Sequence, residues 1–158
     1  MELDEIMKAF DAEIGIESVP ADEDGAYHLQ IDGIGVMVMT IGEGRQLGMF
    51  AEIGDPPAEG REILYRAMLE SMAPGGGCEG MTFSILHNSG RIALSRTDPL
   101  ADTDYAAFRE RLEKLVNTAE DWRRNIADFL PFCEKVREAA KVEDKESLDL
   151  SQSGFMQV

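Results

Sequence analysis

Cysteine, histidine and tryptophan are scarce in this sequence of 158 residues, which has two cysteines, two histidines and one tryptophan. Cys78 and Cys133 lie far apart and form no C-x-x-C motif, so we expect two reduced thiols in a cytosolic protein. Two cysteines and two histidines at scattered positions do not match the ligand spacing of a zinc site. The sequence therefore predicts no metal and no cofactor.

Basic residues are also few, with 15 Lys and Arg against 31 Asp and Glu and a formal net charge of -16. A surface this negative repels the phosphates of nucleic acids and the headgroups of anionic lipids. We therefore exclude both as partners. The same charge favours a basic partner.

Long hydrophobic runs are missing, and no apolar stretch approaches the about 18 residues that a membrane span needs. The first ten residues, MELDEIMKAF, are acidic and amphipathic and do not resemble a signal peptide, so we expect a cytoplasmic protein. The length suits one domain, which we place at residues 1–130. Residues 131–158 are predicted to form a helical extension and a mobile acidic tail.

The pattern of apolar residues predicts alternating groups of helices and strands. Apolar residues at helical spacing indicate helices over 3–14, 59–72 and 105–129, and alternation indicates strands over 26–31, 33–41, 46–54, 81–86 and 91–96. Asp102 or Thr103 is predicted to cap the last helix. This order, α-β-β-β-α-β-β-α, predicts an α+β sandwich with a mostly antiparallel sheet.

The second predicted strand, GIGVMVMTI, is apolar on both faces. Val36 and Val38 lie on one face, and Met37 and Met39 lie on the other. The predicted helices are too few to cover both faces, and methionine side chains adapt to partners of varied shape. One face of this sheet is therefore predicted to bind another protein, with the choice of face left open.

Catalytic candidates are weak. His28 and His87 fall in predicted strands, and no partner that would make either a base is evident. Cys78 follows three glycines and precedes Glu79, and an acidic neighbour disfavours the reactive thiolate. We therefore predict that the protein is not an enzyme.

Several segments in this order resemble the class I type III secretion chaperones of the Tir chaperone (CesT-like) family. They are MKAFDAEIGI, DEDGAYHLQIDG, VMVMTI, LGMFAEIGDPP, REILYRAMLES and GRIALSRTDPLADTDYAAFRERLEKLVNTAEDW. The likeness runs from about Leu3 to Leu130 and rests on the order of elements and apolar positions. It implies a cytoplasmic homodimer that binds the N-terminal segment of a secreted effector in extended form and keeps it competent for secretion.

The resemblance also implies two surfaces. Client binding is expected at apolar residues of the first helix and the first two strands: Leu3, Met7, Phe10, Leu29, Ile31, Val36, Met37, Val38 and Met39. The dimer contact is expected on the second helix and the strand after it: Ile63, Leu64, Ala67, Met68, Met72, Met81, Phe83 and Ile85.

Two other interpretations remain at this point. The first is a structural or regulatory homodimer of the same fold, in which the apolar stripe from Tyr105 to Phe129 pairs as a coiled coil. The second is a small enzyme that uses Cys78 or His87.

Overall fold

The computed structural model describes residues 1–15, 17–78, 80–129, 135, 138–139 and 141–145. These residues form a five-stranded sheet with three α-helices. In chain order the elements are α1 (Leu3–Ile14), β1 (Tyr27–Ile31), β2 (Ile34–Ile41), β3 (Gln46–Gly54), α2 (Arg61–Ser71), β4 (Met81–Ile85), β5 (Ile92–Pro99), the short 3₁₀ helix η1 (Leu100–Asp102) and α3 (Tyr105–Ala127). The predicted α+β class and element order are confirmed. The predicted extension over 131–158 lies largely outside the described residues, as does Cys133.

The sheet has the strand order β1-β2-β3-β5-β4, and every strand pair that the structure describes is antiparallel. β1, β2 and β3 form a meander joined by tight turns, and Asp32 and Gly33 of the first turn have positive φ angles. The meander continues into β5, because Ala51 of β3 pairs with Leu94 of β5. β1 and β4 are therefore the two edges of the sheet.

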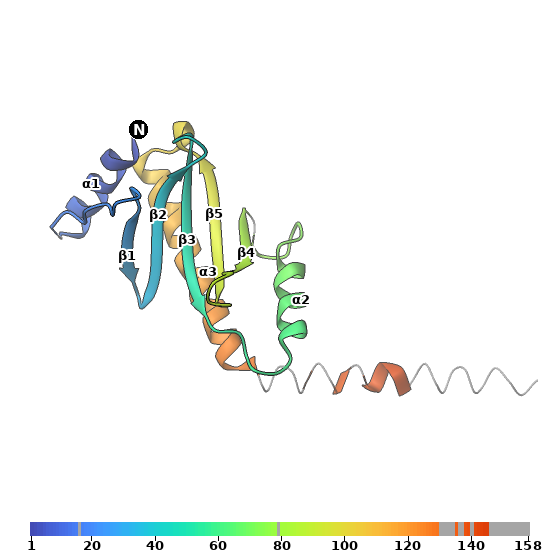
Figure 1. The fold of residues 1–158 in the computed structure, drawn as a ribbon. Coiled ribbons are helices and arrows are strands. Elements are labelled where there is room, and N and C mark those ends of the chain that lie inside the picture. The colour runs from blue at the N-terminus through green and yellow to red at the C-terminus, as the bar shows by residue number, and fades with distance from the viewer. Residues whose placement is uncertain (16, 79, 130–134, 136–137, 140, 146–158) are drawn as a thin grey trace, which may run out of the picture.

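Helices cover one face of the sheet. Figure 1 shows α3 running along that face, with α1 beside β1 and α2 beside β4 at the opposite edge. The core consists of side chains from this face and from the helices that pack on it, including Val36, Val38, Met49 and Leu94. The ring of Phe10 on α1 meets Phe108 of α3 edge to face, with 6.0 Å between centroids.

The apolar stripe of α3 is used inside the chain. Phe108, Leu112, Leu115 and Ala119 are all buried in the core that α3 shares with the sheet. These residues are not free to pair with a second helix, so the coiled-coil interpretation of the stripe is wrong for this part of α3. The stripe is an ordinary core contact of an amphipathic helix.

Both ends of the long helix are fixed by polar contacts. Its N-cap is Asp104, whose carboxylate accepts the Ala107 N–H at 2.8 Å, so the predicted caps Asp102 and Thr103 were wrong by one or two residues. Near the other end, the Arg123 guanidinium donates to the Gly33 carbonyl at 2.8 Å and to the Ile53 carbonyl at 3.2 Å. Arg123 thus ties α3 to the turn between β1 and β2 and to the end of β3.

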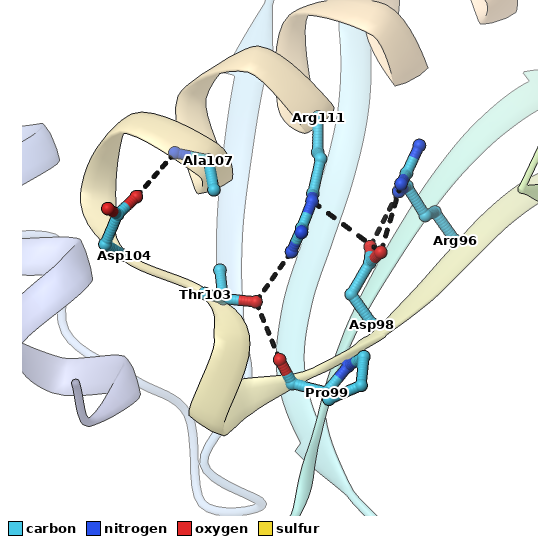
Figure 2. A network of polar contacts seen from close by, with 7 residues as sticks. All are labelled: Arg96, Asp98, Pro99, Thr103, Asp104, Ala107 and Arg111. Atoms are coloured by element: carbon cyan, nitrogen blue, oxygen red, sulfur yellow. Dashed lines mark hydrogen bonds and ion pairs between the residues drawn. The ribbon is translucent and has the colours of Figure 1, made fainter.

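Figure 2 shows the polar network near the start of α3. Arg96 of β5 holds Asp98 with two hydrogen bonds of 2.6 and 3.0 Å, and this carboxylate raises the pKa of the Arg96 guanidinium. Arg111 of α3 lies 3.6 Å from the same carboxylate and donates to the Thr103 hydroxyl at 2.7 Å. Thr103 in turn donates to the Pro99 carbonyl at 2.8 Å. The network joins β5, η1 and α3, so its residues have a structural role.

Candidate client and dimer surfaces

The face of the sheet opposite α3 carries large apolar side chains that no described element covers. Met37, Met39 and Ile41 of β2 and Phe50 of β3 lie there half-buried. The Phe50 ring lies over Gly48, so a Cβ atom at Gly48 would stand 2.8 Å from Phe50 Cε2. The predicted apolar excess of β2 is therefore on this open face, and the helix-covered face is the one with Val36 and Val38.

The open face contains a hollow of about 520 Å³ near the β1–β2 turn and the start of β5. Its floor includes the small residues Gly35 and Ala93, and Met37, Phe50 and Leu86 stand around it. Ala93 points to the open face, yet it is only 4% exposed. The larger side chains around it therefore enclose a real depression.

The strand positions on the open face carry little charge, in contrast to the rest of this acidic chain. Glu52 forms an ion pair with Arg91. The β5 and β4 half of the face displays hydroxyl groups, from Ser95, Thr97 and others. This face suits an apolar or uncharged part of a partner.

A second apolar groove, of about 270 Å³, lies between α2 and the edge strand β4. Leu69 is 65% exposed and Ile85 is 52% exposed, and both line this groove. The Phe83 N–H, which belongs to the sheet edge, is accepted by the sulfur of Met72 at 3.2 Å. A thioether is a weak acceptor, so α2 covers this edge without the strong hydrogen bonds of a paired strand.

A third groove, of about 520 Å³, lies among α1, β1 and α3. It is lined by two of the predicted client-binding residues, Phe10 and Ile31, and by Ile14, which is 49% exposed. Its position beside β1 places it next to the free edge of the sheet.

The predicted client-binding residues separate into three groups. Leu3 and Met7 are buried in the core, and so are Leu29, Val36 and Val38 on the helix-covered face. Phe10 borders the third groove but is itself buried, Ile31 borders the same groove half-buried, and Met37 and Met39 lie on the open face. We carry the client-binding proposal forward only for residues that a partner can reach, because a core side chain offers no surface.

The predicted dimer residues separate in a similar way. Leu64, Met68 and Met81 are buried within the single chain. Ile63, Ala67, Met72 and Phe83 are half-buried, and Ile85 is exposed. Sequence reasoning missed Tyr65 and Leu69, which line the groove beside Met72. Their spacing of i, i+4 and i+7 with Met72 is a helical stripe that could have identified them.

The catalytic candidates gain no support from their surroundings. His87 lies in the turn after β4, so its predicted strand position is wrong, and it is exposed. The Cys78 thiol is buried and 3.5 Å from the Ser71 hydroxyl. Among the described residues, no group of three or more His, Cys, Asp or Glu side chains could hold a metal ion. None of the helices in the part of the chain that the structure describes could span a membrane.

Comparison with known proteins places this fold among secretion chaperones. One chain of the crystal structure of the ExsC–ExsE complex is 22% identical, with a TM-score of 0.66 over 80% of this chain and 97% of that chain. The Yersinia pestis type III secretion chaperone SycH, solved with a stable fragment of YscM2, is 19% identical, with a TM-score of 0.58 over 75% of this chain and 97% of that chain. One chain of the ExoU–SpcU complex from the type III secretion system of Pseudomonas aeruginosa is 15% identical, with a TM-score of 0.61 over 78% of this chain and 97% of that chain.

No curated protein sequence matches the chain. The family model of the Tir chaperone protein (CesT) family matches residues 5–123, which is most of the chain and includes every strand of the sheet. The chain belongs to the Tir chaperone protein (CesT) family.

Proposed function

We propose that this protein is a cytoplasmic, non-enzymatic chaperone that binds the N-terminal segment of a type III secreted effector and holds it extended until secretion. The observation that carries the proposal is the open face of the sheet, where Met37, Met39 and Phe50 lie uncovered in a chain of a chaperone family. A structurally similar protein supports it, since the type III secretion chaperone SycH was solved with a stable fragment of YscM2.

The fold offers an extended client both of the interactions that strand-like peptides use. The free edge at β1 can add main-chain hydrogen bonds, and the grooves beside it can accept alternate side chains. Ordering an unfolded segment costs about 2–5 kcal/mol or more, so a large surface must be buried. A dimer presents that surface twice.

The α2–β4 groove is the surface that we propose for the dimer. Exposed Leu69 and Ile85 have no cover within the described residues, and a two-fold contact would bury them against the same groove of a second copy. Because this surface and the open face use different residues, dimer formation and client binding are separable by mutation.

The test is purification of the tagged full-length chain from its native host, identification of bound proteins and protease mapping of the bound segment. We expect a secreted protein whose N-terminal segment becomes protected only in the complex. Met39→Asp should release this partner, whereas Thr97→Asp should retain it, because Thr97 lies on the same face in the hydroxyl-rich half. A partner bound through a folded domain, or equal retention by both variants, would contradict the proposal.

A further inference from the structure

The hollow on the open face is large enough to accept a large apolar side chain. Small residues from three strands line it, Gly35 of β2, Ala93 of β5 and Ser84 at the edge on β4, and Glu52 of β3 lies between Gly35 and Ala93. Its volume of about 520 Å³ is many times the about 30 Å³ that one water molecule occupies in the liquid. Because Met37, Phe50 and Leu86 border it, filling it with an apolar group would release water from apolar surface.

One border of this hollow is acidic. His28 lines the hollow, and its Nε2 atom lies 2.8 Å from Asp22 Oδ2. The hydrogen bond from His28 lowers the pKa of the Asp22 carboxyl, so Asp22 is ionised at neutral pH. Glu23 and Asp24 follow in the same turn and are exposed. Among the described residues, His28 is the single His, Lys or Arg side chain that a hydrogen bond joins to this turn.

The opposite side is partly compensated, because one arginine is shared by two carboxylates. Arg91 forms an ion pair with Glu52, which lines the hollow, and its Nε lies 3.5 Å from Asp55. More negative charge remains for a partner on the β1 side, where Asp22, Glu23 and Asp24 lie in one turn. A cation on the partner would be attracted more strongly to that side than to the other.

We propose that the hollow binds one aromatic or long aliphatic side chain of the client, and that a Lys or Arg a few residues away on the client meets the acidic turn Asp22–Asp24. This inference rests on the proposed function and adds the sequence chemistry that the client must have. An extended segment advances about 3.3 Å per residue, so an apolar anchor and a nearby cation can reach both features together. The apolar anchor supplies affinity, and the cation sets the direction in which the segment crosses the sheet.

The test uses the full-length protein and fluorescein-labelled peptides of 12 residues. The probe peptide carries one Phe and two Arg in a Gly and Ser background, and two control peptides replace Phe by Ala or both Arg by Glu. We expect the Phe-to-Ala peptide to bind at least about tenfold more weakly, because it loses the burial of a large apolar side chain. Equal binding of the Phe and Ala peptides would overturn the proposal.

Variants of the protein show whether the Phe peptide binds in the hollow. Ala93→Leu fills the hollow from its floor and should weaken the Phe peptide about tenfold. Thr97→Leu is the matched control, since it adds the same side chain on the same strand and face about 13 Å away, and it should bind within about twofold of the wild type. Ser84→Leu fills the hollow from an exposed edge position and replaces Ala93→Leu if that variant loses its native circular dichroism spectrum.

The acidic turn is tested by the double variant Glu23→Gln, Asp24→Asn, which leaves the Asp22–His28 pair in place. It should reduce the preference for the Arg peptide over the Glu peptide at least about threefold, and the difference should shrink at high salt. An unchanged preference would show that the cation is bound elsewhere, which contradicts this part of the proposal.

Two outcomes distinguish this inference from the proposed function. If the native client co-purifies equally with wild type and Ala93→Leu, the protein is a chaperone but the hollow is not its anchor site. If the Phe peptide binds in the hollow but no secreted partner is found in the host, the proposed function fails while the site stands. A change from dimer to monomer in Ala93→Leu, seen by sedimentation, would assign the hollow to a second copy and overturn the proposal.

Discussion

The ring of Phe83 on β4 packs edge to face against the indole of Trp122 on α3, with 5.0 Å between ring centroids and an interplanar angle of 72°. Phe83 also lines the α2–β4 groove, so this pair connects the proposed dimer surface to the core helix. Trp122 is the one tryptophan of the chain. Its fluorescence therefore reports on this region alone.

Phe83→Ala should expose one side of the indole and shift the tryptophan emission to longer wavelength. It should also reduce the free energy of unfolding by about 1–3 kcal/mol, less than for a fully buried Phe because Phe83 is half-buried. Phe50→Ala is the control, since Phe50 lies on the opposite face of the sheet and its loss should leave the emission unchanged. Steady-state fluorescence and urea denaturation measure both effects.

Leu69→Glu should convert a dimer to monomers in sedimentation velocity without loss of secondary structure. Leu69 is 65% exposed in the single chain, so the charge costs nothing in the monomer but is buried in the proposed dimer. Ala106→Glu places the same charge on an exposed position of α3 and should remain dimeric. A Leu69→Glu protein that still sediments as a dimer would show that the contact uses another surface. Met68 is 3% exposed within its own chain, so Met68→Glu would test folding and not assembly.

Val38→Asp and Met39→Asp should differ sharply in stability although the two residues are neighbours. Val38 is fully buried under the helices, so a carboxylate there should destabilise the protein by about 4 kcal/mol or more. Met39 faces the open side, and its substitution should cost about 1 kcal/mol or less. Chemical denaturation measures this difference, and equal losses would mean that both faces of β2 are core.

Tyr27→Phe should change how stability depends on alkaline pH. Burial and a 2.7 Å hydrogen bond to Asp4 raise the pKa of Tyr27 to about 12, above the value of about 10 in an unfolded chain. The native state therefore holds a proton that the unfolded state releases between these values, and stability falls as the pH rises from about 10 to 12.

The Tyr27→Phe variant lacks the ionisable hydroxyl of Tyr27. Its free energy of unfolding should therefore fall less between pH 10 and pH 12 than that of the wild type. At pH 8 it should be less stable than the wild type by about 1 kcal/mol, because it loses the hydrogen bond. The gap should narrow toward pH 12. Urea denaturation at pH 8, 10 and 11.5 measures how this difference in stability changes with pH. A constant difference would show that Tyr27 ionises equally in the folded and unfolded states.

Gly76→Ala should destabilise the protein by about 1–3 kcal/mol. A Cβ atom there would stand 2.4 Å from the Ser71 carbonyl oxygen and 2.7 Å from that of Glu70, and backbone atoms of the helix end cannot move aside as a side-chain tip can. At Gly35 the nearest atom, Gln30 Oε1, is 3.7 Å away, so Gly35→Ala is the matched control with a small effect on the free energy of unfolding. Equal effects would show that the segment after α2 is loosely packed.

The sequence was sufficient for the element order because strand alternation, helical spacing and turn residues agree along most of the chain. It could not decide which face of β2 is open, because Val36 and Met37 are both apolar and only the packing of α3 separates them. It also placed Leu3 and Met7 on a client surface, although both are buried in the core. An apolar stripe on a helix has the same sequence pattern whether the sheet of the same chain or a partner protein covers it.

Leu69 was missed for a related reason. The sequence identifies one apolar stripe on α2, through Leu64 and Met68, and that stripe is the part buried within the chain. The stripe through Tyr65, Leu69 and Met72 lies beside it and becomes visible only when β4 is placed against the helix. The pairing of β3 with β5 is likewise non-local, since α2 and β4 lie between them in the chain.

The two faces of β2 should tolerate substitution to different degrees. Residues such as Val38 interlock with the helices, so replacing them disrupts folding, whereas the side chains of Met37 and Met39 on the reverse side can be exchanged with little penalty. A lineage can therefore drift along that exposed side and acquire a new cargo preference while its scaffold is preserved. Divergent homologues should accordingly retain the inward pattern of this strand and vary in the outward one.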